Sequence, residues 1–226
     1  MSRSLSKVYH TIPLHYVPAL LASGALYASS VLGSPSRPTG VPEGIVPRPT
    51  AARRDQSLGL TDYVHLSLTS KMPLLADKLT RGYSHALLIF DGDAVLALPE
   101  VAVLPYNTKA WRTRACYAPV ADPMERQAIL GRYREGKRMP SLEILVKYGL
   151  PLSLMSTIAF VDDRERDAVF NVSRPGLTDT YQVTVDRDLF PVDDGYKPAH
   201  WESIADYFYR CRQAGLILPP PSIPFD

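Results

Sequence analysis

The residue best suited to chemistry in this sequence is Glu143, a single carboxylate inside the apolar run 141–146. The run is short, contains β-branched residues and is flanked by Pro140 and Pro151, which predicts a strand with a turn at each end. Strand alternation puts Glu143 and Leu145 on one face and the other apolar side chains on the opposite face. A carboxylate on a buried strand is costly unless it is solvated, paired or used. The run therefore indicates either a water-facing Glu on an edge strand or a catalytic carboxylate.

Two further features could bind a ligand. His10 lies at the end of a predicted strand, next to the start of a predicted helix, so it could aim at a ligand, although a lone histidine is more often structural. Arg53 and Arg54 are adjacent. They could form an exposed helical turn, or they could grip a phosphate, for which the planar guanidinium is suited.

The segment 106–119 interleaves cations with aromatic residues. It contains Lys109, Trp111, Arg112 and Arg114. Cations that contact phosphates and rings that stack on bases are typical of sites for single-stranded nucleic acid. Exposed aromatic residues also simply anchor loops, so the segment alone leaves both interpretations open.

Short strands and helices must position these side chains. Periodicity and turn residues predict strands at 7–12, 62–68, 86–90, 101–104, 141–146, 157–161 and 181–185. They predict helices at 14–23, 72–83, 122–135, 164–172 and 200–215, and a turn of helix at 151–156. Residues 34–49 are rich in Pro, Gly and Ser, which is typical of a lid, a binding loop or a disordered loop.

Composition limits the classes of function. The chain has 226 residues, 46% of them hydrophobic, enough for one sizeable core. A net charge of +2 means that any nucleic-acid binding must come from a local patch. The two cysteines show neither metal spacing nor a disulfide framework, so we expect no metal and a reducing, cytoplasmic setting. No apolar run is long enough to predict a transmembrane helix.

Five short motifs occur in one order along most of the chain. They are Tyr9-His10-Thr11-Ile12, Gly24-Ala25-Leu26, Arg53-Arg54 ahead of Asp62-Tyr63-Val64, Ser70-Lys71-Met72-Pro73, and Leu142-Glu143-Ile144-Leu145-Val146. In this order they resemble the DarT toxins, which are DNA ADP-ribosyltransferases. The sequence departs from that family's pattern at Ile12, where a Thr is usual, and at Ala19, where a Gly is usual.

The resemblance implies a fold and an activity. It implies an α+β, ADP-ribosyltransferase-like fold, with split antiparallel and mixed sheets flanked by short helices, in a single domain 1–226. Within it, 34–57 would cover NAD, 106–141 would face the acceptor and 216–226 would be an extended tail. The activity would be transfer of ADP-ribose from NAD as co-substrate, as a glycosyltransferase of pentosyl type and, more loosely, a nucleotidyltransferase.

The resemblance also implies roles for residues. Glu143 and Arg54 would be catalytic, and Lys109, Trp111, Arg112 and Arg114 would bind single-stranded DNA. NAD would be held by His10, Thr11, Ile12, Ala19, Tyr27 and Arg54. The carboxylate would stabilise the oxocarbenium-like transition state and take the proton of the attacking atom.

The identity of the acceptor stays open at this point. The acceptor could be RNA or protein instead of DNA, and an inert binding module on the same fold is an alternative of another class. As a toxin or phage-defence effector, the protein would have an antitoxin as partner and no membrane contact.

Overall fold

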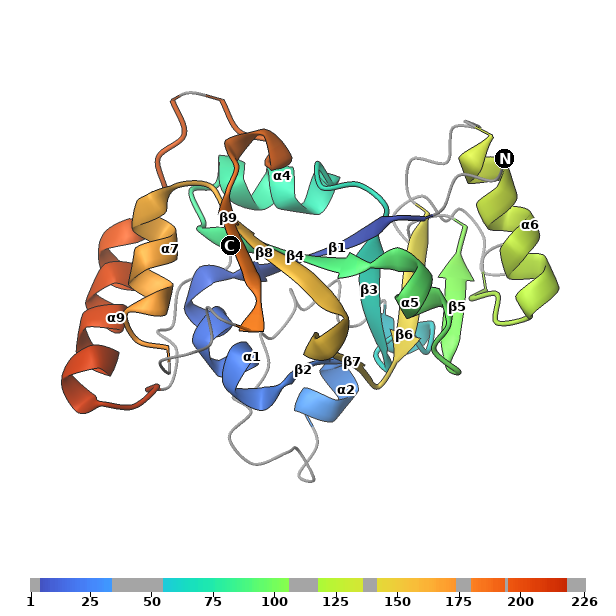
Figure 1. The fold of residues 1–226 in the computed structure, drawn as a ribbon, viewed down its shortest axis with the longest axis horizontal. Coiled ribbons are helices and arrows are strands. Elements are labelled where there is room, and N and C mark those ends of the chain that lie inside the picture. The colour runs from blue at the N-terminus through green and yellow to red at the C-terminus, as the bar shows by residue number, and fades with distance from the viewer. Residues whose placement is uncertain are drawn as a thin grey trace.

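The computed structural model describes residues 5–33, 55–105, 118–135, 142–173, 180–193 and 195–218. In these ranges one large sheet is flanked by helices on its faces and at its ends (Figure 1). The α+β class predicted from the sequence is thereby confirmed. None of the helices in these ranges is long and apolar enough to cross a membrane.

The described strands form a large sheet and a small one. The large sheet has the order β5-β6-β3-β1-β4-β8-β9, and the small sheet pairs β2 with β7. The bounds are β1 Lys7–Pro13, β2 Ala25–Tyr27, β3 Tyr63–Ser67, β4 His85–Asp91, β5 Val101–Leu104, β6 Glu143–Lys147, β7 Gly149–Pro151, β8 Met155–Phe160 and β9 Gln182–Val185. Neighbouring strands are antiparallel except β8 and β9, which are parallel, so the sheet is mixed.

The helices are short, as predicted. The α-helices are α1 Val17–Ser23, α2 Ser29–Leu32, α4 Pro73–Thr80, α5 Gly92–Leu96, α6 Pro123–Arg134, α7 Asp163–Phe170 and α9 Trp201–Ala214. The 3-10 helices are η1 Leu14–Tyr16, η4 Leu152–Leu154 and η5 Arg187–Leu189. Capping residues set the ends of two of these helices. Asp122 caps the start of α6, where its side chain accepts a hydrogen bond from the backbone N–H of Glu125. Gly24, with a φ of 75°, caps the end of α1.

The large sheet is split between β1 and β3. These strands share a single paired position, Tyr9 with Ser67, whereas β1 pairs with β4 at seven positions from Lys7 to Pro13. On its other side β3 pairs with β6 along its whole length, from Tyr63 to Ser67. The molecule therefore has two half-sheets, β5-β6-β3 and β1-β4-β8-β9, which part at this junction, as the split-sheet prediction expects.

The core lies mainly on the face of the sheet covered by α1, α7 and α9. Val64 and Leu66 of β3 join Ile144 and Val146 of β6 in this core. A separate cluster on the opposite face of the β6 half-sheet contains Leu60, Ala102, Leu104 and Leu145. The alternation predicted for the 141–146 run is confirmed, because Leu145 lies with the second cluster.

Several sequence-based boundaries were wrong. The predicted helix 14–23 begins as the 3-10 helix η1, and the turn predicted at 151–156 is largely strand and 3-10 helix. The sequence reading missed β2, α2 and α5, each of five residues or fewer. Such short elements are stabilised by pairing and packing rather than by local propensity, so a periodicity argument cannot find them.

Candidate functional site

Glu143 begins β6, an interior strand of the β5-β6-β3 half-sheet. It lies opposite Ser67 on one side and opposite Leu104 on the other. The alternative of an edge-strand Glu that faces water is therefore wrong, because both neighbouring strands are present. The Glu143 side chain keeps 20% of its surface exposed, so the carboxylate lies at a solvent-accessible end of the strand.

The carboxylate of Glu143 contacts His65 of β3. The Nδ1 atom of His65 lies 2.9 Å from Oε2 of Glu143. Register explains the contact: His65 pairs with Leu145, two residues along β6 from Glu143, so the two polar side chains are diagonal neighbours on one face. On β3, Val64 and Leu66 point into the core, which puts His65 on the other face with Glu143.

His10 joins the same group from β1. Its Nδ1 lies 2.9 Å from the backbone oxygen of His65 and donates a hydrogen bond to it. Burial lowers the pKa of His10, and the bond to His65 only partly offsets this effect. The ring is therefore neutral near pH 7, and with Nδ1 protonated its Nε2 is left as an acceptor. His10 thus contacts the backbone of the residue whose side chain bonds Glu143, at the place where the sheet splits.

Four other described residues are predicted to hold NAD, and they lie on β1, α1 and β2. Thr11 alternates with His10 on β1, so its side chain lies on the face of the sheet shared by Tyr9, Ser67 and Glu143. Ile12 and Ala19 are each only 6% exposed and belong to the core, so their side chains offer little surface to a ligand. Tyr27 lies on β2 opposite Gly149 and is half-buried.

Arg54, Arg53 and the segment with Lys109, Trp111, Arg112 and Arg114 lie outside the described residues. Their roles remain predictions from the sequence. The same holds for most of the predicted NAD-covering segment 34–57 and for the tail from 219. Among the described residues, no group of three His, Cys, Asp or Glu side chains could hold a metal ion.

His65 is the site residue that sequence reasoning missed. A signal was present, because alternation along 62–68 separates His65 and Ser67 from the apolar Val64 and Leu66. What the sequence lacked was the pairing of this strand with β6 in a register that sets His65 diagonally from Glu143.

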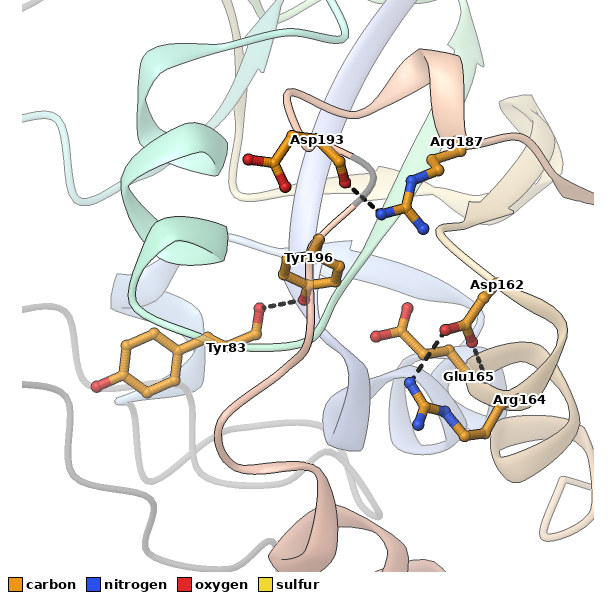
Figure 2. A network of polar contacts seen from close by, with 7 residues as sticks. All are labelled: Tyr83, Asp162, Arg164, Glu165, Arg187, Asp193 and Tyr196. Atoms are coloured by element: carbon orange, nitrogen blue, oxygen red, sulfur yellow. Dashed lines mark hydrogen bonds and ion pairs between the residues drawn. The ribbon is translucent and has the colours of Figure 1, made fainter.

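A second polar group is fully enclosed around Glu165 of α7. Glu165 is 0% exposed, and neither carboxylate oxygen has a hydrogen-bond partner among the described residues. Figure 2 shows it among Asp162, Arg164 and Tyr196, with an Asp162–Arg164 ion pair of 3.1 Å and the Tyr196 hydroxyl 3.2 Å from the backbone oxygen of Tyr83. Burial raises the pKa of Glu165 to about 7. This group is separate from the His65–Glu143 contact at the split of the sheet.

Solved structures share the fold of this chain. The fold matches DarT of Thermus sp. 2.9 in complex with ADP-ribosylated ssDNA, with 17% identity and a TM-score of 0.59, over 84% of this chain and 100% of that chain. It matches the same protein in complex with NAD+ at 17% identity and a TM-score of 0.55, over 84% and 100%.

A third match is Thermosipho africanus DarTG in complex with ADP-ribose, with 13% identity and a TM-score of 0.62, over 81% of this chain and 50% of that chain. No protein-family model matches the sequence, and no curated protein matches it. At these identities the likeness shows a shared fold, and the chain has the DarT-type ADP-ribosyltransferase fold that its motifs predict.

The comparisons do not support the looser assignment as a nucleotidyltransferase. Nucleotidyl transfer attacks a phosphorus atom. ADP-ribosyl transfer breaks the bond between nicotinamide and ribose and leaves the pyrophosphate intact, so the two classes differ in the bond that breaks.

Proposed function

We propose that this chain is an NAD-dependent ADP-ribosyltransferase that modifies a base of single-stranded DNA, with Glu143 at its reaction centre. The observation that carries the proposal is the placement of Glu143 on the interior strand β6, bonded to His65 at the split of a DarT-type sheet. The fold neighbours support the substrates, since one was solved with NAD+ and another with ADP-ribosylated ssDNA.

The reaction breaks the bond between the nicotinamide nitrogen and the ribose C1′, and nicotinamide leaves with the bonding electron pair. A nitrogen or oxygen of the acceptor base then forms a bond to C1′ and loses its proton. The Glu143 carboxylate has two tasks in this sequence. It stabilises the positive charge that develops on the ribose, and it accepts the proton of the attacking atom.

The described residues fit an NAD co-substrate in type. The free acceptor atom of His10, Nε2, suits the N–H or O–H donors of the nicotinamide half. The pyrophosphate of NAD is anionic and needs a cationic partner. We propose Arg54 for this role, with Arg53 as the second choice. Thr11 and the backbone groups near Ile12 are proposed to complete the nicotinamide side, since the Ile12 side chain itself is in the core.

The acceptor strand is proposed to bind through Lys109, Trp111, Arg112 and Arg114. In a chain of net charge +2, these residues would supply local attraction for phosphates and a ring for base stacking. A role as toxin or phage-defence effector, neutralised by an antitoxin, is proposed on the resemblance to the DarT toxins.

The test is incubation of the purified protein with NAD labelled in its adenylate half and, separately, with single-stranded DNA, RNA and protein. We expect label on DNA. If label appears only on RNA or only on protein, that molecule is the acceptor instead of DNA. If label appears on none of the three, the protein is not an ADP-ribosyltransferase of this kind.

The matched variant for this assay is Glu143→Gln. It keeps the size of the side chain and a hydrogen-bond acceptor but removes the carboxylate. We expect transfer to fall by about 100-fold or more, while NAD affinity measured by calorimetry changes little. Transfer near the wild-type rate would place the reaction centre elsewhere.

A further inference from the structure

His65 is the described side chain in direct contact with Glu143, and the contact has the geometry of an ion pair. The Nδ1–Oε2 distance of 2.9 Å is that of a charge-assisted hydrogen bond. The backbone of His65 is itself fixed, because its oxygen accepts a bond from His10 and its residue pairs with Leu145 of β6. The imidazole therefore approaches Glu143 from a rigid position.

Both ring nitrogens of His65 face acceptors. Nδ1 faces the Glu143 carboxylate, and Nε2 lies 3.5 Å from the backbone oxygen of Leu60, a weak contact at the limit of hydrogen bonding. A carboxylate and a carbonyl can only accept, so the ring satisfies both contacts when both nitrogens carry hydrogens. That form of histidine is the cationic imidazolium.

The charges around the ring agree with this protonation state. Burial by itself lowers the pKa of His65, but the hydrogen bond and charge of Glu143, together with the charge of Asp55, outweigh it, so the pKa is raised. The groups that face His65 from the described elements are Glu143 on β6, Asp55 ahead of β3 and the neutral His10 on β1. Two carboxylates and one neutral ring favour a cation.

We infer that His65 is a positioning residue that holds the Glu143 carboxylate in its reactive orientation as the cationic partner of an ion pair. The inference rests on the proposed function for its catalytic meaning. The contact with His65 occupies one of about four hydrogen-bond positions of the carboxylate and restricts the orientation of its plane.

The first experiment is independent of activity. The five histidines of the chain are followed through a pH titration by NMR, in the wild type and in Glu143→Gln, with each signal assigned from a His→Asn variant. Burial lowers the pKa of His10, and it lowers the pKa of His15 to about 4 and that of His85 to about 3, so these three signals titrate in a different range from His65. We expect the His65 midpoint to lie above 6.5 in the wild type and to move to lower pH in Glu143→Gln. An unchanged midpoint would overturn the ion pair.

The second experiment measures kcat/KM for transfer against pH. In the wild type we expect activity to decline as pH rises through the raised pKa of His65, because the ring then loses the positive charge that pairs with the Glu143 carboxylate. His65→Ala should lower kcat/KM by roughly tenfold or more, since misplacing a reacting group by about 1 Å costs up to about 100-fold. NAD affinity should stay near that of the wild type.

The conservative variant separates positioning from a structural role. The amide N–H of His65→Asn can still donate near the place of Nδ1, but it does not titrate. Because it restores a donor without a charge, we expect it to recover only part of the activity that His65→Ala loses at neutral pH, and to show no alkaline decline. The matched control is His200→Asn, at the start of α9, where the ring stacks on Tyr83 at 5.0 Å, and it should leave the profile unchanged.

The outcomes distinguish this inference from the proposed function. A wild type that transfers ADP-ribose to no acceptor would contradict the function, while the NMR titration would still decide whether the ion pair exists. Wild-type rates with a wild-type pH profile in His65→Ala would overturn the positioning role even if transfer itself is confirmed.

Discussion

At the scale of single residues, two histidines next to each other in space have opposite roles at the split. Burial keeps His10 neutral, and its Nδ1–H is used by the His65 carbonyl, so its free nitrogen accepts. His65 faces two acceptors and a carboxylate, which favours the cation. The charge of each ring follows from what it touches rather than from its residue type, since histidine titrates near neutral pH and small effects move it either way.

The residue-scale prediction concerns the arginine pair. Of two adjacent residues only one can point into the site, and the spacing to the strand at Tyr63 favours Arg54. Because a hydrogen bond to a charged group contributes about 1.5–3 kcal/mol, we expect Arg54→Ala to weaken NAD binding by roughly 10- to 100-fold. Calorimetric titration of both single variants with NAD is the measurement. Arg53→Ala is the matched control, and an equal or larger loss there would reverse the choice.

At the scale of elements, β6 connects the reaction centre to the two-stranded sheet beside it. It ends at Lys147. The next residue, Tyr148, has a φ of 62°, and the chain then enters β7, where Gly149 pairs with Tyr27 of β2. A Cβ at Gly149 would lie 3.2 Å from Cδ1 of Tyr27, so this strand pair is tightly packed. The strand that begins with Glu143 is therefore held at its far end by contacts to the segment that follows α1.

The element-scale prediction concerns the segment 106–117, which precedes α6. Loss of a phosphate contact should weaken DNA binding uniformly across sequences and reduce the salt slope by about one unit. We therefore expect Lys109→Ala and Arg112→Ala to weaken binding of the DNA acceptor, and we expect the size of this loss to depend on the salt concentration. Trp111→Ala should remove stacking worth roughly 1–3 kcal/mol per base.

The measurement is acceptor titration at fixed NAD and at two salt concentrations. Arg210→Ala is the matched control, because it also removes one positive charge but lies on α9, paired with Asp206. Acceptor dependence that is unchanged in all three variants would mean that the strand binds elsewhere.

At the scale of the whole molecule, the buried carboxyl that affects stability is not the carboxylate of the candidate site. The group around Glu165 is enclosed near α7, α4 and the segment before α9 (Figure 2), whereas Glu143 keeps contact with solvent. A fully buried carboxyl without a hydrogen-bond partner favours its neutral form in the folded state. Protonation of Glu165 therefore affects the stability of the fold and is separate from the proposed reaction at Glu143.

The molecule-scale prediction follows from the sign of this shift. The pKa of Glu165 rises from an ordinary 4.5 to about 7, so between these values the folded state keeps a proton that the unfolded state has lost. The free energy of unfolding should then fall as pH rises from 4.5 to 7, by roughly 3 kcal/mol, and level off above that. Glu165→Gln removes this loss, so its stability relative to the wild type should increase over the same window.

Urea unfolding of both proteins at several pH values measures the difference. His15 and His85, whose pKa values burial lowers, contribute the opposite slope, but they are present in both proteins and cancel. Glu202→Gln, an exposed change in the first turn of α9, is the matched control. Parallel stability curves for the wild type and Glu165→Gln would show that the buried carboxyl does not titrate in this range.

The sequence by itself determined most of the elements and singled out one carboxylate on an apolar strand. Alternation predicted the strand of Glu143, and turn residues bounded it, because both are local properties of the chain. Asp122 and Gly24 marked a helix start and a helix end for the same reason. The order of five short motifs predicted the DarT-type fold, which the solved structures confirm.

Only the tertiary structure decided what surrounds the carboxylate. The partner His65 comes from a strand 78 residues away in sequence, and its approach depends on the register of β3 with β6 and on the split between β3 and β1. Strand order and register arise from packing among distant segments, so no local pattern in the sequence specifies them. The enclosure of Glu165 has the same origin, because desolvation is a property of the assembled core and not of the residue.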